Sequence, residues 1–228
     1  LVKIMKSKNI DNIFISAPEN VAWLLNIRGK DSPHSPIPNC KIILTKTKKI
    51  FFFSCPKKTK KIKKYYDYKK IIFCVYQDFS KIINKLKGNN FTIDSQTCSV
   101  SNEKLIRKMF NIKLNKDPCY ALKAIKNKSE IKGMIASHIE DGLALTRFIY
   151  WIKNINKKKI TEVDAQKKLE KFRRLNKNYL FPSFDTIAGT GSNGAIVHYR
   201  ATQKRTAIIK NNDIFLCDSG GQYKYGTT

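Results

Sequence analysis

The sequence has 228 residues, of which 42% are hydrophobic and 27% are charged. This length allows one large domain or two small ones with a real core, and the hydrophobic share excludes a disordered chain. No apolar run approaches the ~18 residues of a membrane-spanning helix, and the start LVKIMK lacks the apolar segment of a signal peptide. We therefore expect no membrane partner.

The formal charge of +28 is the most unusual feature of the composition. Such a balance is typical of proteins that bind nucleic acid or an anionic surface. However, only seven of the 45 basic residues are arginines, which leaves 38 lysines, whereas specific phosphate and base recognition favours arginine. Lys, Ile and Asn share A/T-rich codons, so genome composition can produce this charge. We expect no specific nucleic-acid partner.

None of the six cysteines forms a CxxC pair, which argues against a zinc ribbon. Their mostly apolar surroundings predict reduced, half-buried thiols and, with no secretory signal, a cytoplasmic protein.

The first half of the chain alternates strand and helix patterns, which predicts a mixed α/β domain. The polar turn at residues 45–49 between two apolar runs predicts a hairpin. A run at residues 57–70 holds eight lysines and three tyrosines; it is typical of a solvated helix face, with single-strand binding as the alternative. In chain order we expect strands at 13–15, 41–44, 50–53, 71–75 and 91–93, and helices at 17–25, 79–86 and 101–110.

The second half begins with a long helix from Ser129, whose apolar residues recur every three or four positions. A break at residues 156–159 precedes Thr161, which opens a capping box and a helix to about Asn176. Strands follow at 185–188, 195–199 and 214–218, with glycine-rich turns between them. We predict an α+β second domain, and divide the chain into domains 1–122 and 123–228.

Two segments carry side chains suited to chemistry. Asp218 ends an apolar strand before a Gly-Gly bend, where a carboxylate must be paired or metal-bound unless the turn is solvated. His198 follows the run Asn-Gly-Ala-Ile-Val and is either a ligand, a proton donor or a core residue. His138 lies on the apolar stripe of its helix and is interpreted as structural, and His34 has no obvious partner in the sequence.

Several segments together resemble a known family. Residues 182–199 (PSFDTIAGTGSNGAIVHY), residues 218–223 (DSGGQY) and the helix opening at residues 126–131 are similar to the catalytic domain of Xaa-Pro aminopeptidases (aminopeptidase P), in the pita-bread metallopeptidase family. Residues 22–31 (AWLLNIRGKD) resemble the non-catalytic, creatinase-like middle domain of the three-domain enzymes. The resemblance covers nearly the whole chain and implies a creatinase-like domain followed by the first part of a pita-bread domain.

The resemblance also implies a metal centre and residue roles. The family holds two divalent ions, usually manganese and sometimes zinc, on two Asp, one His and two Glu. Asp218 matches the first Asp ligand, whereas His198 matches the substrate-side histidine that stabilises the reaction near the scissile bond. Arg28 lies on the middle-domain loop near the active-site mouth and is expected to meet substrate, with a structural salt bridge as the alternative.

The implied activity is release of the N-terminal residue from peptides with proline in second position, by a cytoplasmic enzyme that dimerises when complete. We expect the chain to lack the first domain and the remaining ligands, and so to be inactive alone. Prolidase or another creatinase-like enzyme is an alternative, although the middle-domain motif argues against the dipeptidase. A pita-bread binding protein without catalysis is a further alternative, favoured only by the basic surface.

Overall fold

The computed structural model describes residues 1–60, 62–65, 70–154 and 159–228. These residues form two compact units, one comprising Leu1–Ser32 and Pro36–Ile125 and the other Pro33–Ser35 and Lys126–Thr228. Residues 61 and 66–69 of the predicted lysine-rich run at 57–70, and residues 156–158 of the predicted helix break at 156–159, lie outside the described residues. Among the described residues, no helix combines the length and apolarity needed to cross a bilayer.

The first unit is built on a six-stranded mixed sheet in the order β4-β3-β2-β1-β5-β6. Strands β1, β2 and β3 pair antiparallel, whereas β4, β5 and β6 each add parallel to a neighbour. The predicted hairpin is confirmed, because Lys41 pairs with Phe53 and Leu44 with Ile50 across the turn. The strands are β1 (Asn12–Ile15), β2 (Lys41–Thr45), β3 (Ile50–Phe53), β4 (Ile71–Cys74), β5 (Asn90–Ile93) and β6 (Asn111–Leu114).

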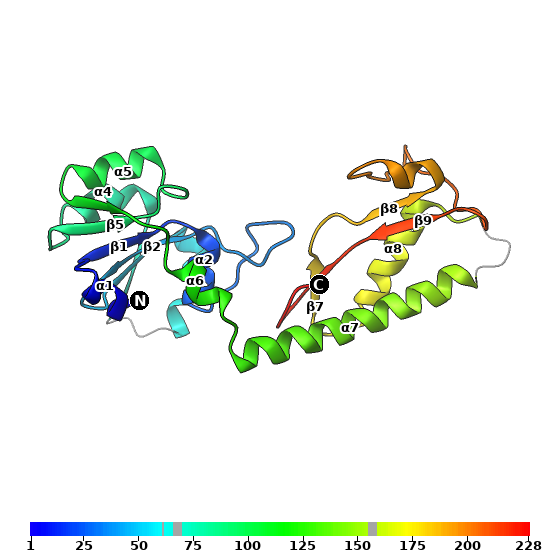
Figure 1. Ribbon diagram of the computed structural model, residues 1–228, viewed down its shortest axis with the longest axis horizontal. Helices are drawn as coiled ribbons and strands as arrows, with labels where there is room; N and C mark the ends of the chain where they lie inside the picture. Colours follow the sequence, from blue (N-terminus) through cyan, green and yellow to red (C-terminus); the bar gives the residue numbers. More distant parts are fainter. Residues whose placement is uncertain (61, 66–69, 155–158) are drawn as a thin grey trace. The chain divides into compact units, whose positions relative to one another are not determined.

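Helices cover both faces of this sheet, so the first unit has three layers (Figure 1). Successive strand residues point to opposite faces: Ile13 and Ile15 join one apolar cluster with Met5 and Val21, while Phe14 joins the other. The helices are α1 (Val2–Ser7), α2 (Pro18–Leu24), α3 (Pro56–Thr59), α4 (Phe79–Ile83), α5 (Val100–Arg107) and α6 (Cys119–Ala124), with short 3-10 turns η1 (Ile62–Tyr65) and η2 (Tyr76–Asp78).

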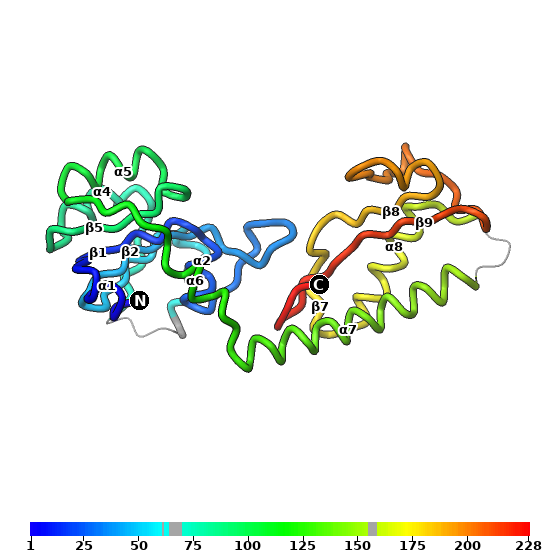
Figure 2. Tube along the Cα trace, in the orientation of Figure 1, coloured from blue at the N-terminus to red at the C-terminus, as the bar shows by residue number. Residues whose placement is uncertain are grey.

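The described residues of the second unit form two helices and two pairs of antiparallel strands, and Figure 2 follows them along the chain trace. Both helices begin with complete capping boxes, Asn127 with Glu130 and Thr161 with Asp164, so the predicted helix starts are confirmed. The elements are α7 (Lys128–Lys153), α8 (Glu162–Arg173), β7 (Tyr179–Pro182), β8 (Ile187–Thr190), the 3-10 turn η3 (Gly191–Ala195), β9 (Phe215–Asp218) and β10 (Gly221–Tyr223). Strand β8 pairs with β9, and β7 with β10.

The buried face of α7 differs from the predicted apolar stripe. Leu145 and Ile152 pack on the core around Phe148, as expected, but His138 is exposed, with its Nδ1 atom 3.0 Å from the Met134 carbonyl oxygen. Several apolar residues of helix α7 lie outside this core. Its buried residues are Ser137, Asp141, Ala144 and Phe148, whereas Ile131, Met134, Ile135 and Ile149 are each at least 40% exposed.

A buried ion pair joins the helices to the strands in the second unit. The Arg173 side chain is 1% exposed and that of Asp141 is 5% exposed; Arg173 Nε lies 2.7 Å from Asp141 Oδ1. The Tyr223 hydroxyl donates to the same oxygen at 2.7 Å, and Arg173 Nη2 also donates to Ser219 Oγ at 3.1 Å. Burial raises the pKa of Asp141, but hydrogen bonds from Arg173 and Tyr223 outweigh it, so the pKa lies below its ordinary value.

All six cysteines are free, and four of them are buried. Burial raises the pKa of the Cys40 thiol to about 12 and those of Cys74 and Cys98 to about 11. The thiols are thus more deeply buried than the predicted half-buried state, with Cys217 intermediate and Cys55 exposed.

Candidate active site

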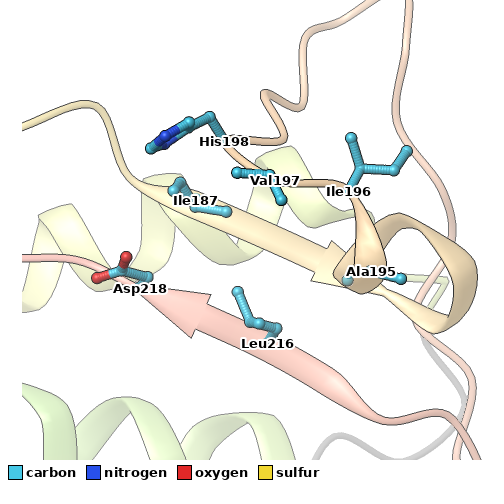
Figure 3. Close-up of a pocket in the computed structure, with 8 residues that line it drawn as sticks. Ile187, Ala195, Ile196, Val197, His198, Leu216 and Asp218 are labelled. Carbon is cyan, nitrogen blue, oxygen red and sulfur yellow. The ribbon is translucent and has the colours of Figure 1, made fainter.

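A cavity of about 350 Å³ lies between strands β8 and β9 and the segment that follows η3. Its walls are apolar except for His198 and Asp218. In Figure 3 the imidazole and the carboxylate lie at the same end of the cavity, with Ile187 between them in the view. The lining residues are Ile187, Gly194, Ala195, Ile196, Val197, His198, Leu216 and Asp218.

Strand β9 directs Asp218 into this cavity by its alternation. Phe215 and Cys217 pack on the core of the second unit, so Leu216 and Asp218 face the opposite side. Asp218 is the last residue of β9 and pairs with Ile187 of β8. Its side chain is exposed rather than buried, so the sequence-based argument from a buried carboxylate does not hold in the described chain.

The segment between strands β9 and β10 requires glycine at position 220. A Cβ atom on Gly220 would lie 2.0 Å from the Thr228 carbonyl oxygen and 2.3 Å from Ser183 Oγ. Two hydrogen bonds hold the same segment, because Ser183 N donates to the Gly220 oxygen and Thr228 N to the Gly221 oxygen, both at 3.0 Å. The predicted bend at residues 219–221 is wrong, because the chain enters strand β10 at Gly221 without a turn or bend; glycine at position 220 instead allows a close backbone approach.

His198 does not lie in a strand, so the predicted strand at 195–199 is wrong. Residues 191–195 form the 3-10 turn η3, and His198 follows in a turn with φ of +55°. The left-handed region is uncommon for a residue other than glycine and is found at functional sites and tight turns. The turn exposes the His198 side chain, whereas the next residue, Tyr199, is buried.

Arg28 and His34 also have defined surroundings. In the first unit, the exposed Arg28 side chain donates from Nη1 to the Ile27 carbonyl oxygen at 3.0 Å, and among the described residues it makes no ion pair. His34 groups with the second unit, where its Nε2 lies 3.1 Å from Asp185 Oδ1 and its Nδ1 lies 3.0 Å from the Pro182 oxygen. These partners of His34 are about 150 positions away, so no local pattern could indicate them.

The described residues do not complete a metal centre. Asp218 offers the hard carboxylate oxygens that suit Mn²⁺. However, across residues 1–60, 62–65, 70–154 and 159–228, no group of three or more His, Cys, Asp or Glu side chains could hold a metal ion. One carboxylate does not hold two ions, so a dinuclear site would need ligands other than those described.

Comparison with known proteins gives consistent matches along the chain. A peptidase of Schizosaccharomyces pombe is 36% identical and is matched over all of this chain and 38% of its own length. A protein of Ajellomyces dermatitidis named "Probable Xaa-Pro aminopeptidase P" is 34% identical, over all of this chain and 40% of its own length. The chain therefore spans about two-fifths of the length of these relatives.

Solved structures agree in fold. The X-prolyl aminopeptidase of Caenorhabditis elegans, described as a cytosolic enzyme with a di-nuclear active site, superposes with a TM-score of 0.89 at 27% identity. That match covers all of this chain and 38% of the nematode chain. A prolidase of Pyrococcus furiosus shares the fold with a TM-score of 0.69 at 24% identity, over 98% of this chain and 61% of its own.

A three-layer α/β domain followed by helices and antiparallel strands is the fold shared with the solved aminopeptidase and prolidase structures. The chain belongs to the creatinase/prolidase family: residues 1–130 match the Creatinase/Prolidase N-terminal domain. Residues 132–228 match Metallopeptidase family M24. The expected fold class, a creatinase-like domain followed by the start of a pita-bread domain, is thereby confirmed.

Proposed function

We propose that the complete protein carrying this chain is a metal-dependent aminopeptidase that releases the N-terminal residue from peptides with proline in second position. The observation that carries the proposal is the cavity in which Asp218 and His198 lie together within the segment matched to family M24. Relatives at 34–36% identity and the aminopeptidase structure with a TM-score of 0.89 support it.

In this proposal His198 acts on the substrate carbonyl. An imidazole N–H that donates to the carbonyl oxygen stabilises the negative charge that develops there, and one such donor contributes a factor of about 10²–10³ in turnover. Ile187, Val197 and Leu216 give this cavity apolar walls beside the imidazole. The exposed imidazole is already accessible to a substrate.

Asp218 is proposed as a metal ligand. Two bound divalent ions would supply a hydroxide nucleophile at neutral pH, and we propose manganese first and zinc as the alternative. Because the described residues do not complete the site, we expect the 228-residue chain alone to be inactive on Xaa-Pro peptides with either ion. Hydrolysis by the pure chain clearly above a metal-only blank would contradict this.

The roles are tested in the complete protein with three variants. Asp218→Ala is expected to abolish activity and lower the metal content, because a carboxylate ligand is lost. His198→Ala is expected to lower kcat by about 10²–10³ while the metal content stays unchanged. His138→Ala is the control, because His138 is exposed on α7 and is not part of the cavity lining. If His198→Ala lost metal as completely as Asp218→Ala, His198 would be a ligand.

Substrate length distinguishes the aminopeptidase from a prolidase. We expect cleavage of tripeptides and longer peptides with proline second, whereas activity confined to Xaa-Pro dipeptides would indicate a prolidase. We also propose that residues 1–122 and 123–228 act as separate domains. Arg28 is proposed to contact the substrate, so Arg28→Ala is expected to raise KM. The complete protein is proposed to be a cytoplasmic homodimer without a specific nucleic-acid partner.

A further inference from the structure

The carboxylate of Glu162 is buried and fully used. Glu162 is the first residue of α8 and is 0% exposed. Its Oε1 atom accepts hydrogen bonds from Thr190 N at 2.8 Å and Asn193 Nδ2 at 2.9 Å. Its Oε2 atom accepts from the Tyr199 hydroxyl at 2.8 Å and Ala207 N at 2.9 Å. A single side chain thus receives four donors.

The carboxylate is ionised at neutral pH. Burial raises the pKa of Glu162, but the backbone N–H groups of Thr190 and Ala207 and the side chains of Asn193 and Tyr199 outweigh it, so the pKa lies below its ordinary value. Hydrogen bonds to an ionised acceptor are roughly twice as strong as neutral ones. Glu162 is therefore a strong, fixed attachment point inside the second unit.

Three of the four donors belong to residues 190–199, the segment that forms one wall of the candidate active site, and the fourth, Ala207 N, lies beyond it. Thr190 ends β8, Asn193 lies in η3, and Tyr199 comes directly after the cavity residues 194–198. The attachments at Asn193 and Tyr199 bracket these residues, and Asn193 Nδ2 also donates to the Tyr199 hydroxyl at 3.0 Å. Glu162 therefore holds both ends of the wall that carries His198.

His198 depends on this support. Its backbone has a φ of +55°, and no hydrogen bond to a described residue orients its imidazole. Its direction is consequently set by the backbone and by its neighbour Tyr199, which is 2% exposed and fixed through its hydroxyl. A left-handed residue persists only where the surrounding structure determines it.

We propose that Glu162 is a positioning residue that, through Tyr199 and Asn193, orients His198 toward the cavity. The proposal rests on the proposed function, in which His198 acts on the substrate. It predicts that loss of the hydrogen bonds to Glu162 lowers kcat only when the His198 imidazole is present.

The first test uses NMR on the 228-residue chain and needs no activity. The chain has three histidines, and His198→Asn assigns the His198 ring signal. Tyr199→Phe, which removes only the hydroxyl, and Glu162→Gln are both expected to shift or broaden that signal while His138 stays unchanged. Tyr179→Phe is the matched control, because its hydroxyl donates to Glu170 on the same helix at 2.5 Å without touching the segment. Unchanged His198 signals in both test variants would overturn the proposal.

The second test measures kinetics in the complete protein. Tyr199→Phe and Glu162→Gln are expected to lower kcat by about ten- to a hundred-fold, with little change in KM or metal content, whereas Tyr179→Phe stays within about two-fold of wild type. In a His198→Ala background the same substitutions are expected to lower kcat no further, as for residues that act as a unit. Additive losses in that background, or wild-type kcat in both single variants, would overturn the positioning role.

The two tests separate this proposal from the proposed function. If the complete protein shows no activity on Xaa-Pro peptides, the proposed function fails, while the NMR result still decides whether Glu162 positions His198. If Glu162→Gln does not fold, as judged by circular dichroism, Tyr199→Phe decides alone, because it keeps the buried ring.

Discussion

Replacing Arg173 by methionine is expected to destabilise the second unit strongly. Met fills similar volume but removes the cation that lies 2.7 Å from the Asp141 carboxylate. Asp141 then keeps the hydrogen bond from Tyr223 at 2.7 Å, without a compensating charge. Removing one partner of a buried ion pair costs about 3–5 kcal/mol, because the other charge stays buried.

The adjacent arginine provides a matched control. Arg174 lies on the same helix and makes an ion pair with Glu170 at 2.8 Å, but its side chain is 70% exposed. A solvent-exposed pair contributes about 0–1 kcal/mol, so Arg174→Met is expected to change stability by no more than that. The two neighbouring substitutions remove the same group and differ mainly in burial.

Urea unfolding with tryptophan fluorescence measures both effects. The two tryptophans are Trp23 in the first unit and Trp151 in the second. In a Trp23→Phe background the signal comes from Trp151, whose ring packs 5.9 Å from that of Phe148. Arg173→Met should lose about 3–5 kcal/mol, and adding Asp141→Leu should recover at least about 1 kcal/mol by removing the unpaired charge.

The pH dependence supplies a second criterion. Because the folded pKa of Asp141 lies below the ordinary 3.8, its contribution to stability is present above about pH 4 and is lost as the pH falls through the folded value. The stability difference between wild type and Arg173→Met should therefore narrow below pH 4. The reasoning is refuted if Arg173→Met costs no more than Arg174→Met at pH 7.

Three further predictions concern the fold. Gly220→Ala should cost about 1–3 kcal/mol in urea unfolding, because its Cβ would lie 2.0 Å from the Thr228 oxygen. Gly142→Ala, with nothing within 4 Å of its Cβ, should instead stabilise α7 by about 0.5–1 kcal/mol. Equal effects of the two substitutions would contradict the close contact at position 220. A hydrogen bond from the Asn90 N–H, followed in size by one from Lys46, lowers the pKa of Asp11 from 3.8 to about 2. The stability that this ionised carboxylate contributes is therefore lost as the pH falls through this range, and Asp11→Asn should reduce the loss of unfolding free energy measured on acidification. The exposed Cys55 should react with a thiol reagent in the folded chain, whereas the buried Cys40, with its pKa raised to about 12 by burial, should react only after unfolding; rapid labelling of Cys40 would refute its burial.

The elements that sequence patterns predicted well are those determined locally. The hairpin around residues 45–49 and the capping box at Thr161 depend on neighbouring residues. Strand β6 (Asn111–Leu114) was not predicted, because Asn-Ile-Lys-Leu at a sheet edge has little apolar pattern and depends on pairing with β5.

The candidate site shows the same division. The strand that ends at Asp218 was predicted from its apolar run, whereas the bend predicted from Gly-Gly is replaced by the start of β10 at Gly221. The segment at 195–199 was predicted as a strand because Ile196 and Val197 favour strands. Glu162, 37 positions before Tyr199, instead draws that residue inward by a hydrogen bond, and no local pattern contains this contact. The roles of Asp218, His198 and Arg28 remain predictions.

The order of strands in the first unit has a consequence for how quickly the chain reaches its native form. The β2–β3 hairpin joins residues 44 and 50, a closure that takes about 1–10 μs. The β1–β5 ladder joins residues 12 and 91, and parallel pairing at such sequence distance must wait until the intervening chain has been ordered. Until then β1 presents an open edge to neighbouring molecules, so dilute solution should favour recovery from denaturant.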